Sequence, residues 1–363
     1  MKKILLRTAA LILAAVSLYV TPAGAISAQK AIVLDATTGR ILYEKRADEK
    51  SLIASTTKIM TALVVCQQCN VLDRVKIPKE AVGIEGSSMY LQAGDVLTVQ
   101  ELLYGLMLQS GNDAAVALAI YCGGTVEGFS QLMNDKARFL GLRNTHFVNP
   151  HGLDHPDHYS TARDLAILAA YAMDDPVFRK TVSTKSIQID DRRFTNHNRL
   201  LWAVEGADGV KTGFTKAAGR ILVSSAKRDD RRLVVVTIDD GDDWRDHTAL
   251  YEEGFSSYHQ EQIVTKGDCL GGIPVVNGKE DFVRVLAAED FSYALATGEK
   301  PYIRLSNKGF VYAPLRQNAQ AGFAYVCLGG KVVGRIQVVY ESSVVEQEVK
   351  KPSLWERLIG GAP

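Results

Sequence analysis

The sequence has little net charge and few cysteines, and each of these features excludes a class of protein. Its formal net charge at pH 7 is +1, so it lacks the excess of positive charge with which proteins bind nucleic acid, and we expect no nucleic acid partner. Its five cysteines are odd in number and scattered, which does not fit a disulfide scaffold. Cys66 and Cys69 form a C-x-x-C pair without a second pair, so we expect core packing, with at most one disulfide, rather than zinc or redox chemistry.

The sequence also lacks an apolar run long enough to cross a membrane. The apolar stretch at residues 9–20 is shorter than the roughly 20 residues of a spanning helix. It follows Lys2, Lys3 and Arg7 and precedes the small residues up to Ala25, an order typical of a secretory signal peptide. We therefore expect residues 1–25 to be removed by cleavage after Ala25. The mature protein would lie at the outer face of the cytoplasmic membrane, in the periplasm or in the cell wall.

A chain of 363 residues with 47% hydrophobic residues can bury a full core and predicts two domains. Residues 26–262 would form the first. A hairpin is predicted at 31–36 and 40–44, helices between 55 and 173, strands at 221–226 and 233–238, and a helix at 247–258. Thr98 and Glu101 predict a capping box ahead of one helix. Since the strands lie at both ends of this segment, we expect an α+β fold with a helical insert.

Residues 263–342 show a different pattern, with short alternating segments between glycine-rich turns, and predict a small β-sandwich-like domain. The tail at 343–363 contains Leu354, Trp355, Leu358 and Ile359, which would share one face of a short amphipathic helix. Gly360 and Gly361 end that helix after about two turns, a length that is marginal in water. Peripheral membrane contact and a disordered tail both remain open.

Three short motifs carry the chemistry. They are S-x-x-K at Ser55 to Lys58, S-x-N at Ser110 to Asn112, and K-T-G at Lys211 to Gly213. S-x-x-K also occurs at Ser27 and Ser224, but Ser27 adjoins the predicted cleavage site and Ser224 lies in a predicted strand. Only at Ser55 does the motif open a helical run, so that Lys58 shares a face with the hydroxyl.

A lysine whose pKa is lowered by burial can deprotonate a serine, and the helix start supplies N–H groups for an oxyanion. Alone, Ser55 would fit a helix N-cap, and Ser110 to Asn112 would fit a turn. The single K-T-G suits a strand at the edge of a cleft, where an extended peptide pairs with the backbone and its terminal carboxylate meets Lys211 and Thr212. The three motifs together favour a catalytic site.

With these motifs the sequence resembles the low-molecular-mass penicillin-binding proteins that act as D-alanyl-D-alanine carboxypeptidases. The likeness runs from about residue 29 to 340 and includes residues 86–88, 149–153, 159–165 and 243–247. The resemblance implies a penicillin-binding/β-lactamase-like domain, with helices on both faces of an antiparallel sheet, followed by an all-β domain. It also implies peptidoglycan stem peptides as substrates, β-lactams as covalent inhibitors, and no cofactor or metal.

The same resemblance implies roles for individual residues. Ser55 would form the acyl-enzyme, Lys58 would be the general base, and Ser110 would relay a proton to the leaving D-alanine. Asn112 would hold the substrate amide, and the backbone N–H groups of Ser55 and Phe214 would bind the oxyanion. Lys211, Thr212 and Gly213 would form the carboxylate-binding strand, with Arg245 as a further carboxylate ligand.

Four other functions are each suggested by part of the sequence. A β-lactamase of class A needs a glutamate between the second and third motifs to activate water, and Glu127 and Glu205 do not match that pattern. A DD-endopeptidase would share the fold and the motifs. A metallopeptidase is suggested by His151, Asp154, His155, Asp157 and His158, although Gly152 and Pro156 make that segment a loop. A protein that only binds wall peptides would not require both Ser55 and Lys58.

Overall fold

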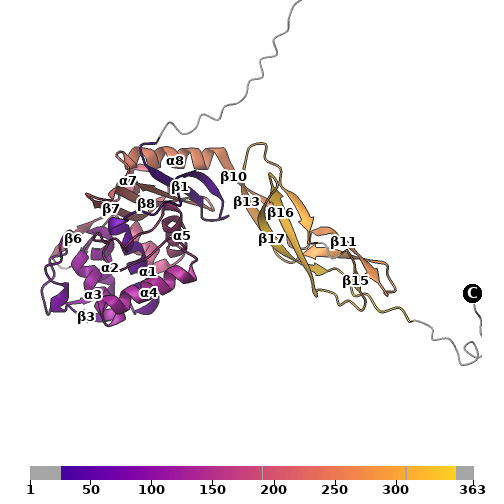
Figure 1. The fold of residues 1–363 in the computed structure, drawn as a ribbon, viewed down its shortest axis with the longest axis horizontal. Helices are drawn as coiled ribbons and strands as arrows, with labels where there is room; N and C mark the ends of the chain where they lie inside the picture. The colour runs from indigo at the N-terminus through magenta and orange to yellow at the C-terminus, as the bar shows by residue number, and fades with distance from the viewer. Residues whose placement is uncertain (1–25, 190, 307–308, 349–363) are drawn as a thin grey trace, which may run out of the picture.

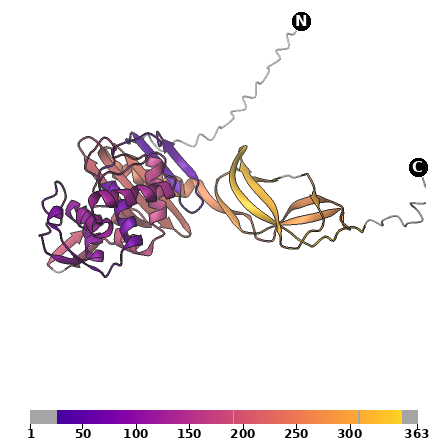
Figure 2. The same ribbon diagram turned by 60° about the horizontal axis from the view of Figure 1, so that its bottom comes forward.

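The computed structural model describes residues 26–189, 191–306 and 309–348, which form two domains (Figures 1 and 2). A five-stranded antiparallel sheet in the order β2-β1-β9-β8-β7 organises the first domain. Its strands are β1 (Lys30–Asp35), β2 (Ile41–Lys45), β7 (Ala207–Thr215), β8 (Gly219–Arg228) and β9 (Arg231–Ile238). The β1-β9 pairing joins strands from opposite ends of the domain, as the sequence predicts, and leaves β7 at an edge.

Helices cover both faces of this sheet (Figure 1). They are η1 (Ala54–Thr57), α1 (Lys58–Gln68), α2 (Val99–Leu108), α3 (Asn112–Gly123), α4 (Val126–Phe139), α5 (Ala162–Ala172), α6 (Pro176–Ser183), α7 (Leu200–Ala203) and α8 (Asp243–Ser257). α8 packs on one face of β8 and β9, and α5 packs on the other face with the helical insert beyond it. The α+β fold class is therefore confirmed.

Local signals explain where several elements begin. At α2 the predicted capping box is present, because Thr98 Oγ1 accepts a hydrogen bond from the Glu101 amide at 3.2 Å and the Glu101 carboxylate accepts one from the Thr98 amide. The prediction that α8 begins at 247 is wrong, since the helix starts at Asp243 with acidic side chains in its first turn. This shift brings Asp243 and Trp244 onto the helix.

The segment between α1 and α2 is less helical than the sequence predicts. It contains β3 (Arg74–Lys76), η2 (Lys79–Ala81) and β4 (Val96–Thr98), and β3 pairs with β4. Pro78 interrupts helical hydrogen bonding, and Gly86 adopts a φ of +93° that an L-residue rarely takes. A second hairpin, β5 (Ser186–Ile189) with β6 (Arg192–Thr195), also lies in the insert.

The second domain is all β, as the sequence predicts, and has its own hydrophobic core. Its strands are β10 (Tyr258–Val264), β11 (Cys269–Val276), β12 (Phe282–Ala287), β13 (Phe291–Ala296), β14 (Tyr302–Leu305), β15 (Val311–Tyr312), β16 (Gln320–Leu328) and β17 (Lys331–Tyr340). In the part of the chain that the structure describes, no helix is long and apolar enough to span a membrane. The predicted signal peptide and the predicted helix of the tail lie outside the described residues.

Arg40, in the turn between β1 and β2, joins the two domains. Its guanidinium donates to Glu299 at 2.5 and 2.7 Å and to the Ala294 carbonyl at 2.6 Å. It also lies over the rings of Tyr258 and Tyr293, 4.8 and 5.5 Å from their centroids. The Arg40 side chain is only 14% exposed, so water screens this pair weakly.

We expect Glu299→Gln to lower the free energy of unfolding by about 1.5 kcal/mol, because it removes the charge from a bidentate, partly buried contact. Urea denaturation measures this change. Glu49→Gln is the matched control, since Glu49 pairs with Arg46 at 2.6 Å but is 47% exposed, and this change should lower the free energy of unfolding much less than Glu299→Gln does. If both variants lost the same free energy of unfolding, the Arg40–Glu299 contact between the domains would be no stronger than an exposed ion pair.

Candidate active site

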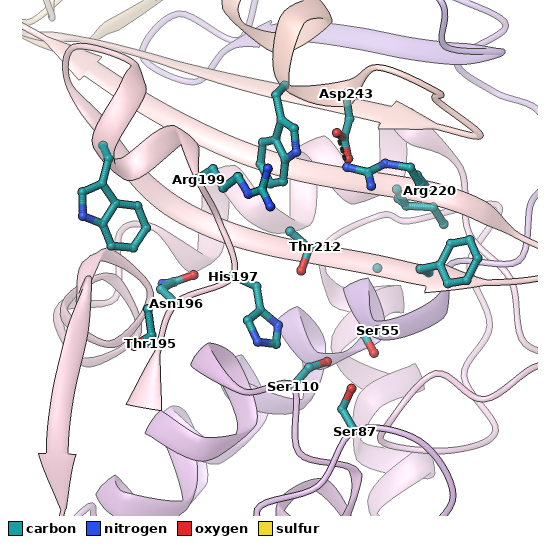
Figure 3. Close-up of a pocket in the computed structure, with 15 residues that line it drawn as sticks. Ser55, Ser87, Ser110, Thr195, Asn196, His197, Arg199, Thr212, Arg220 and Asp243 are labelled. Atoms are coloured by element: carbon teal, nitrogen blue, oxygen red, sulfur yellow. Dashed lines mark hydrogen bonds and ion pairs between the residues drawn. The ribbon is translucent and has the colours of Figure 1, made fainter. Parts of the chain in front are cut away.

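Ser55 lies in the 3₁₀ turn η1, directly ahead of α1, and its side chain faces the base of a cleft (Figure 3). Lys58 is the first residue of α1 and is fully buried, as is most of that helix. The Lys58 ammonium group reaches back over the turn, so that Nζ lies 3.0 Å from Ser55 Oγ. The S-x-x-K spacing therefore places the two groups in contact, as the helical reading predicts.

Lys58 has only neutral hydrogen-bond partners among the described residues. Besides Ser55 Oγ, its Nζ contacts Asn112 Oδ1 at 2.6 Å and the His151 carbonyl at 2.7 Å. Burial, and then the positive charge of Lys211, hold the pKa of Lys58 well below its usual value. A neutral amine has two N–H donors and one lone pair. With Asn112 and His151 accepting the two N–H bonds, the lone pair is left for the Ser55 hydroxyl.

Ser110 and Asn112 come from the tight connection between α2 and α3. Ser110 has a φ of +62°, an unusual value for a residue other than glycine, and its hydroxyl lies near those of Ser55 and Ser87 in the cleft (Figure 3). Asn112 is 4% exposed, and its Nδ2 donates to the Glu85 carbonyl at 2.5 Å. Its amide thus contacts Lys58 and the Glu85 carbonyl, and its contact with a substrate amide stays a prediction.

The K-T-G motif lies on β7, the edge strand beside the cleft. Thr212 and Phe214 line the cleft, and the Phe214 side chain is 64% exposed. Lys211 is buried, and its burial lowers the pKa to about 7. A Cβ on Gly213 would lie 3.3 Å from the Ser55 amide nitrogen and 3.2 Å from that of Thr56, so glycine allows β7 to approach the nucleophile closely.

The cleft has a volume of about 830 Å³, and several residues in its wall escaped the sequence analysis. They are His197, Arg199, Trp202, Arg220 and Trp244 (Figure 3). Arg220 donates to Asp243 at 2.5 Å, whereas Arg199 forms no ion pair with any residue that the structure describes. Only Trp244 belonged to a segment that the resemblance had marked. Trp202 lies in α7, Arg220 in β8, and His197 and Arg199 in a loop, and none of these four belongs to a motif.

Arg245 is not brought to the cleft. Its guanidinium is 64% exposed and pairs with Asp242 and Asp246, each at 3.3 Å. One turn of α8 directs Asp243 and Trp244 to the cleft, and Arg245 points elsewhere. The structure therefore does not place Arg245 as a carboxylate ligand, and Arg199 and Arg220 are the arginines that line the site.

The histidines of the loop at 151–158 support the nucleophile turn. His158 Nε2 lies 2.7 Å from Thr57 Oγ1, and the His151 carbonyl accepts from Lys58. Burial lowers the pKa of His151 to about 4 and that of His158 to about 3, so both are neutral at pH 7. Among the described residues, no three His, Cys, Asp or Glu side chains converge in a way that could hold a metal ion.

The chain matches two families of known proteins along most of its length. Residues 17–242 match the family described as D-alanyl-D-alanine carboxypeptidase, and residues 258–346 match the family described as the C-terminal domain of penicillin-binding protein 5. The first matched range contains the hydrophobic core of the first domain. The second matched range begins at residue 258, where β10 begins.

Individual relatives agree with this assignment. The chain is 32% identical to the D-alanyl-D-alanine carboxypeptidase DacF of Bacillus subtilis over 86% of this chain and 84% of the relative. It is 34% identical to DacC of Escherichia coli, over 89% and 86%. Penicillin binding protein 5 from Haemophilus influenzae superposes with a TM-score of 0.78 at 31% identity, over 89% of this chain and 98% of that one. The chain therefore belongs to the D-alanyl-D-alanine carboxypeptidase family of serine peptidases.

Proposed function

We propose that this protein removes the terminal D-alanine from peptidoglycan stem peptides through an acyl-enzyme on Ser55, and that penicillins acylate the same serine. The observation that carries the proposal is the contact of Ser55 Oγ with a fully buried lysine at 3.0 Å, beside an open strand edge. Membership of the carboxypeptidase family supports the choice of reaction.

Acylation would begin when the Ser55 hydroxyl gives its proton to neutral Lys58 as Oγ attacks the carbonyl carbon of the penultimate residue. The developing oxyanion would be stabilised by the N–H groups of Ser55 and Phe214, which the close approach of β7 to η1 supports. Ser110 would donate its proton to the nitrogen of the leaving D-alanine as the peptide bond breaks, and would regain one from protonated Lys58, which becomes neutral again. Water would then attack the ester as Lys58 takes one of its protons, and Lys58 would return that proton to Ser55 Oγ as the ester bond breaks.

The carboxylate of the terminal D-alanine would bind beside Lys211 and Thr212, while the peptide backbone lies along the edge strand β7. Arg199 would add positive charge to this part of the cleft. A protonated Lys211 attracts the carboxylate and also keeps the pKa of Lys58 low. The two lysines would thus act in opposite protonation states, one as a cation and one as a base.

We further propose that residues 1–25 are removed on export and that the domains span residues 26–262 and 263–342. The absence of a spanning helix among the described residues, and relatives that are carboxypeptidases of bacteria, are compatible with work on the cell wall. Contact of the 343–363 tail with a membrane surface is part of this proposal.

We expect Ser55→Ala to abolish covalent labelling by a fluorescent penicillin, because no other hydroxyl contacts Lys58 among the described residues. Ser27→Ala and Ser224→Ala, which change the other two S-x-x-K serines, should retain labelling, since these serines contact Asp240 and His247 instead. Mass spectrometry of the labelled protein identifies the acylated residue. Labelling that persists in the Ser55 variant would refute the assignment.

We expect Gly213→Ala to reduce the second-order rate of penicillin acylation by roughly tenfold or more, because the added methyl group pushes β7 away from η1. The unfolding temperature should change little. Gly241→Ala is the matched control, because a Cβ there meets nothing within 4 Å. An acylation rate equal to that of the control would show that the spacing of β7 from Ser55 is not critical.

The pH profile of kcat/KM for a D-Ala-D-Ala peptide should be bell-shaped. Activity rises as Lys58 becomes neutral and falls above a pH of about 7, as Lys211 loses its proton and its attraction for the carboxylate. Because a guanidinium stays charged, Lys211→Arg should move the alkaline limb up by more than about 2 pH units in whatever activity remains. An unchanged alkaline limb in Lys211→Arg would exclude Lys211 as its origin.

A further inference from the structure

Two buried carboxylates meet at the start of the described chain, on the side of the sheet opposite the helical insert. Asp240 follows β9 and Asp246 lies in the first turns of α8, and they are 1% and 2% exposed. Ser27 joins them: its Oγ contacts Asp240 Oδ1 at 2.5 Å and Asp246 Oδ2 at 2.9 Å, and its amide donates to Asp246 Oδ2. We call these three residues the Asp240/Asp246 site.

The Asp240/Asp246 site has less positive charge than two buried carboxylates require. Arg245 is the cation paired with it in the described chain, through a single contact of 3.3 Å from a guanidinium that is 64% exposed. Asp240 forms no ion pair there, and its buried Oδ2 has no hydrogen-bond partner of normal geometry, although the Thr237 hydroxyl is near. Burial raises the pKa of Asp240. Lys45 lies beside this part of the chain, but its Nζ donates to the carbonyls of Ile26 and Ala28.

Ile26 lies immediately beside this site. Its side chain is buried in the core cluster under α8, with Val33, Leu222 and Tyr251. Its backbone nitrogen is three covalent bonds from that of Ser27, a separation of at most about 3.7 Å. Since the Ser27 amide already contacts Asp246, any charge on the Ile26 nitrogen would be within Coulombic range of that carboxylate.

We propose that the Asp240/Asp246 site binds the α-ammonium group of Ile26 after the signal peptide is removed. Hydrolysis of the Ala25–Ile26 bond by a processing endopeptidase adds one water, which leaves a carboxylate on Ala25 and an ammonium group on Ile26. The ammonium supplies the missing positive charge and up to three donors, one of them for Asp240 Oδ2. The inference rests on the predicted cleavage after Ala25, and it is independent of the reaction at Ser55.

The consequence is an anchor between the first mature residue and α8. In the precursor, the same nitrogen is an uncharged amide with one donor, and the two carboxylates lack this partner. Because α8 also places Asp243 and Trp244 in the wall of the cleft, processing would fix this helix on the sheet as the protein leaves the membrane. The mature fold would then be more stable than that of the precursor.

The experiment compares the mature chain that begins at Ile26 with one that carries Gly-Ser-Ala ahead of Ile26, which moves the ammonium away. The chain that begins at Ile26 should unfold at a temperature on the order of 5 °C higher. Asp246→Asn should reduce this difference to about 1 °C or less, because its amide offers no charge to the ammonium. Asp242→Asn, which changes an exposed neighbour on the same turn, should preserve the difference.

A second measurement does not depend on these variants being folded. In competitive labelling with trace acetic anhydride, the pKa of the Ile26 α-amino group should lie above the roughly 8 of a free terminus. Equal unfolding temperatures for the two chains, a difference that survives in Asp246→Asn, or an unshifted α-amino pKa would each overturn the proposal. So would an exported protein whose intact mass shows a first residue other than Ile26.

Discussion

The burial of two lysines side by side is the constraint on which the active site depends. Lys58 and Lys211 are both almost without exposure, and each loses hydration that no carboxylate replaces directly. Burial lowers the pKa of both lysines, and the positive charge of Lys211 lowers that of Lys58 further. In the proposed mechanism the same residue type supplies both a base and a cation, and the surroundings of each lysine decide which role it takes.

Burial of the two lysines costs free energy, and the fold holds them in place by bringing three separate segments together at the site. The turn η1 carries the serine, the connection from α2 to α3 supplies Ser110 and Asn112, and β7 closes the third side. Each segment is tied to a different layer, since η1 continues into the buried α1 and β7 belongs to the sheet. Backbone conformations that most residues avoid, at Ala54 and Ser110, occur at these junctions, where the surrounding packing holds them.

Much of this could be predicted from the sequence because the motifs are local. The contact of Ser55 with Lys58 follows from helical spacing, and the position of Lys211 on an edge strand follows from the K-T-G motif between Asp208-Gly209 and the run that leads to Ile221. The cleft wall could not be predicted, since His197 and Arg199 belong to a loop whose position depends on tertiary packing. Arg245 shows the same limit, because a one-residue difference along a helix turns a side chain by about 100°. Asn112 lies at the site, as predicted, and its two hydrogen bonds, to Lys58 and to the Glu85 carbonyl, could not be predicted from the sequence.

The elongated arrangement of the two domains bears on where substrate can be reached. The described chain ends beside β11 and β15, at the end of the β domain that is remote from the catalytic domain (Figures 1 and 2). If the tail is held at a surface, the β domain acts as a stiff arm, and the Arg40 joint sets the angle at its end. The cleft would then stay at a fixed height above that surface. The local concentration of stem-peptide ends at that height would therefore govern the rate of turnover.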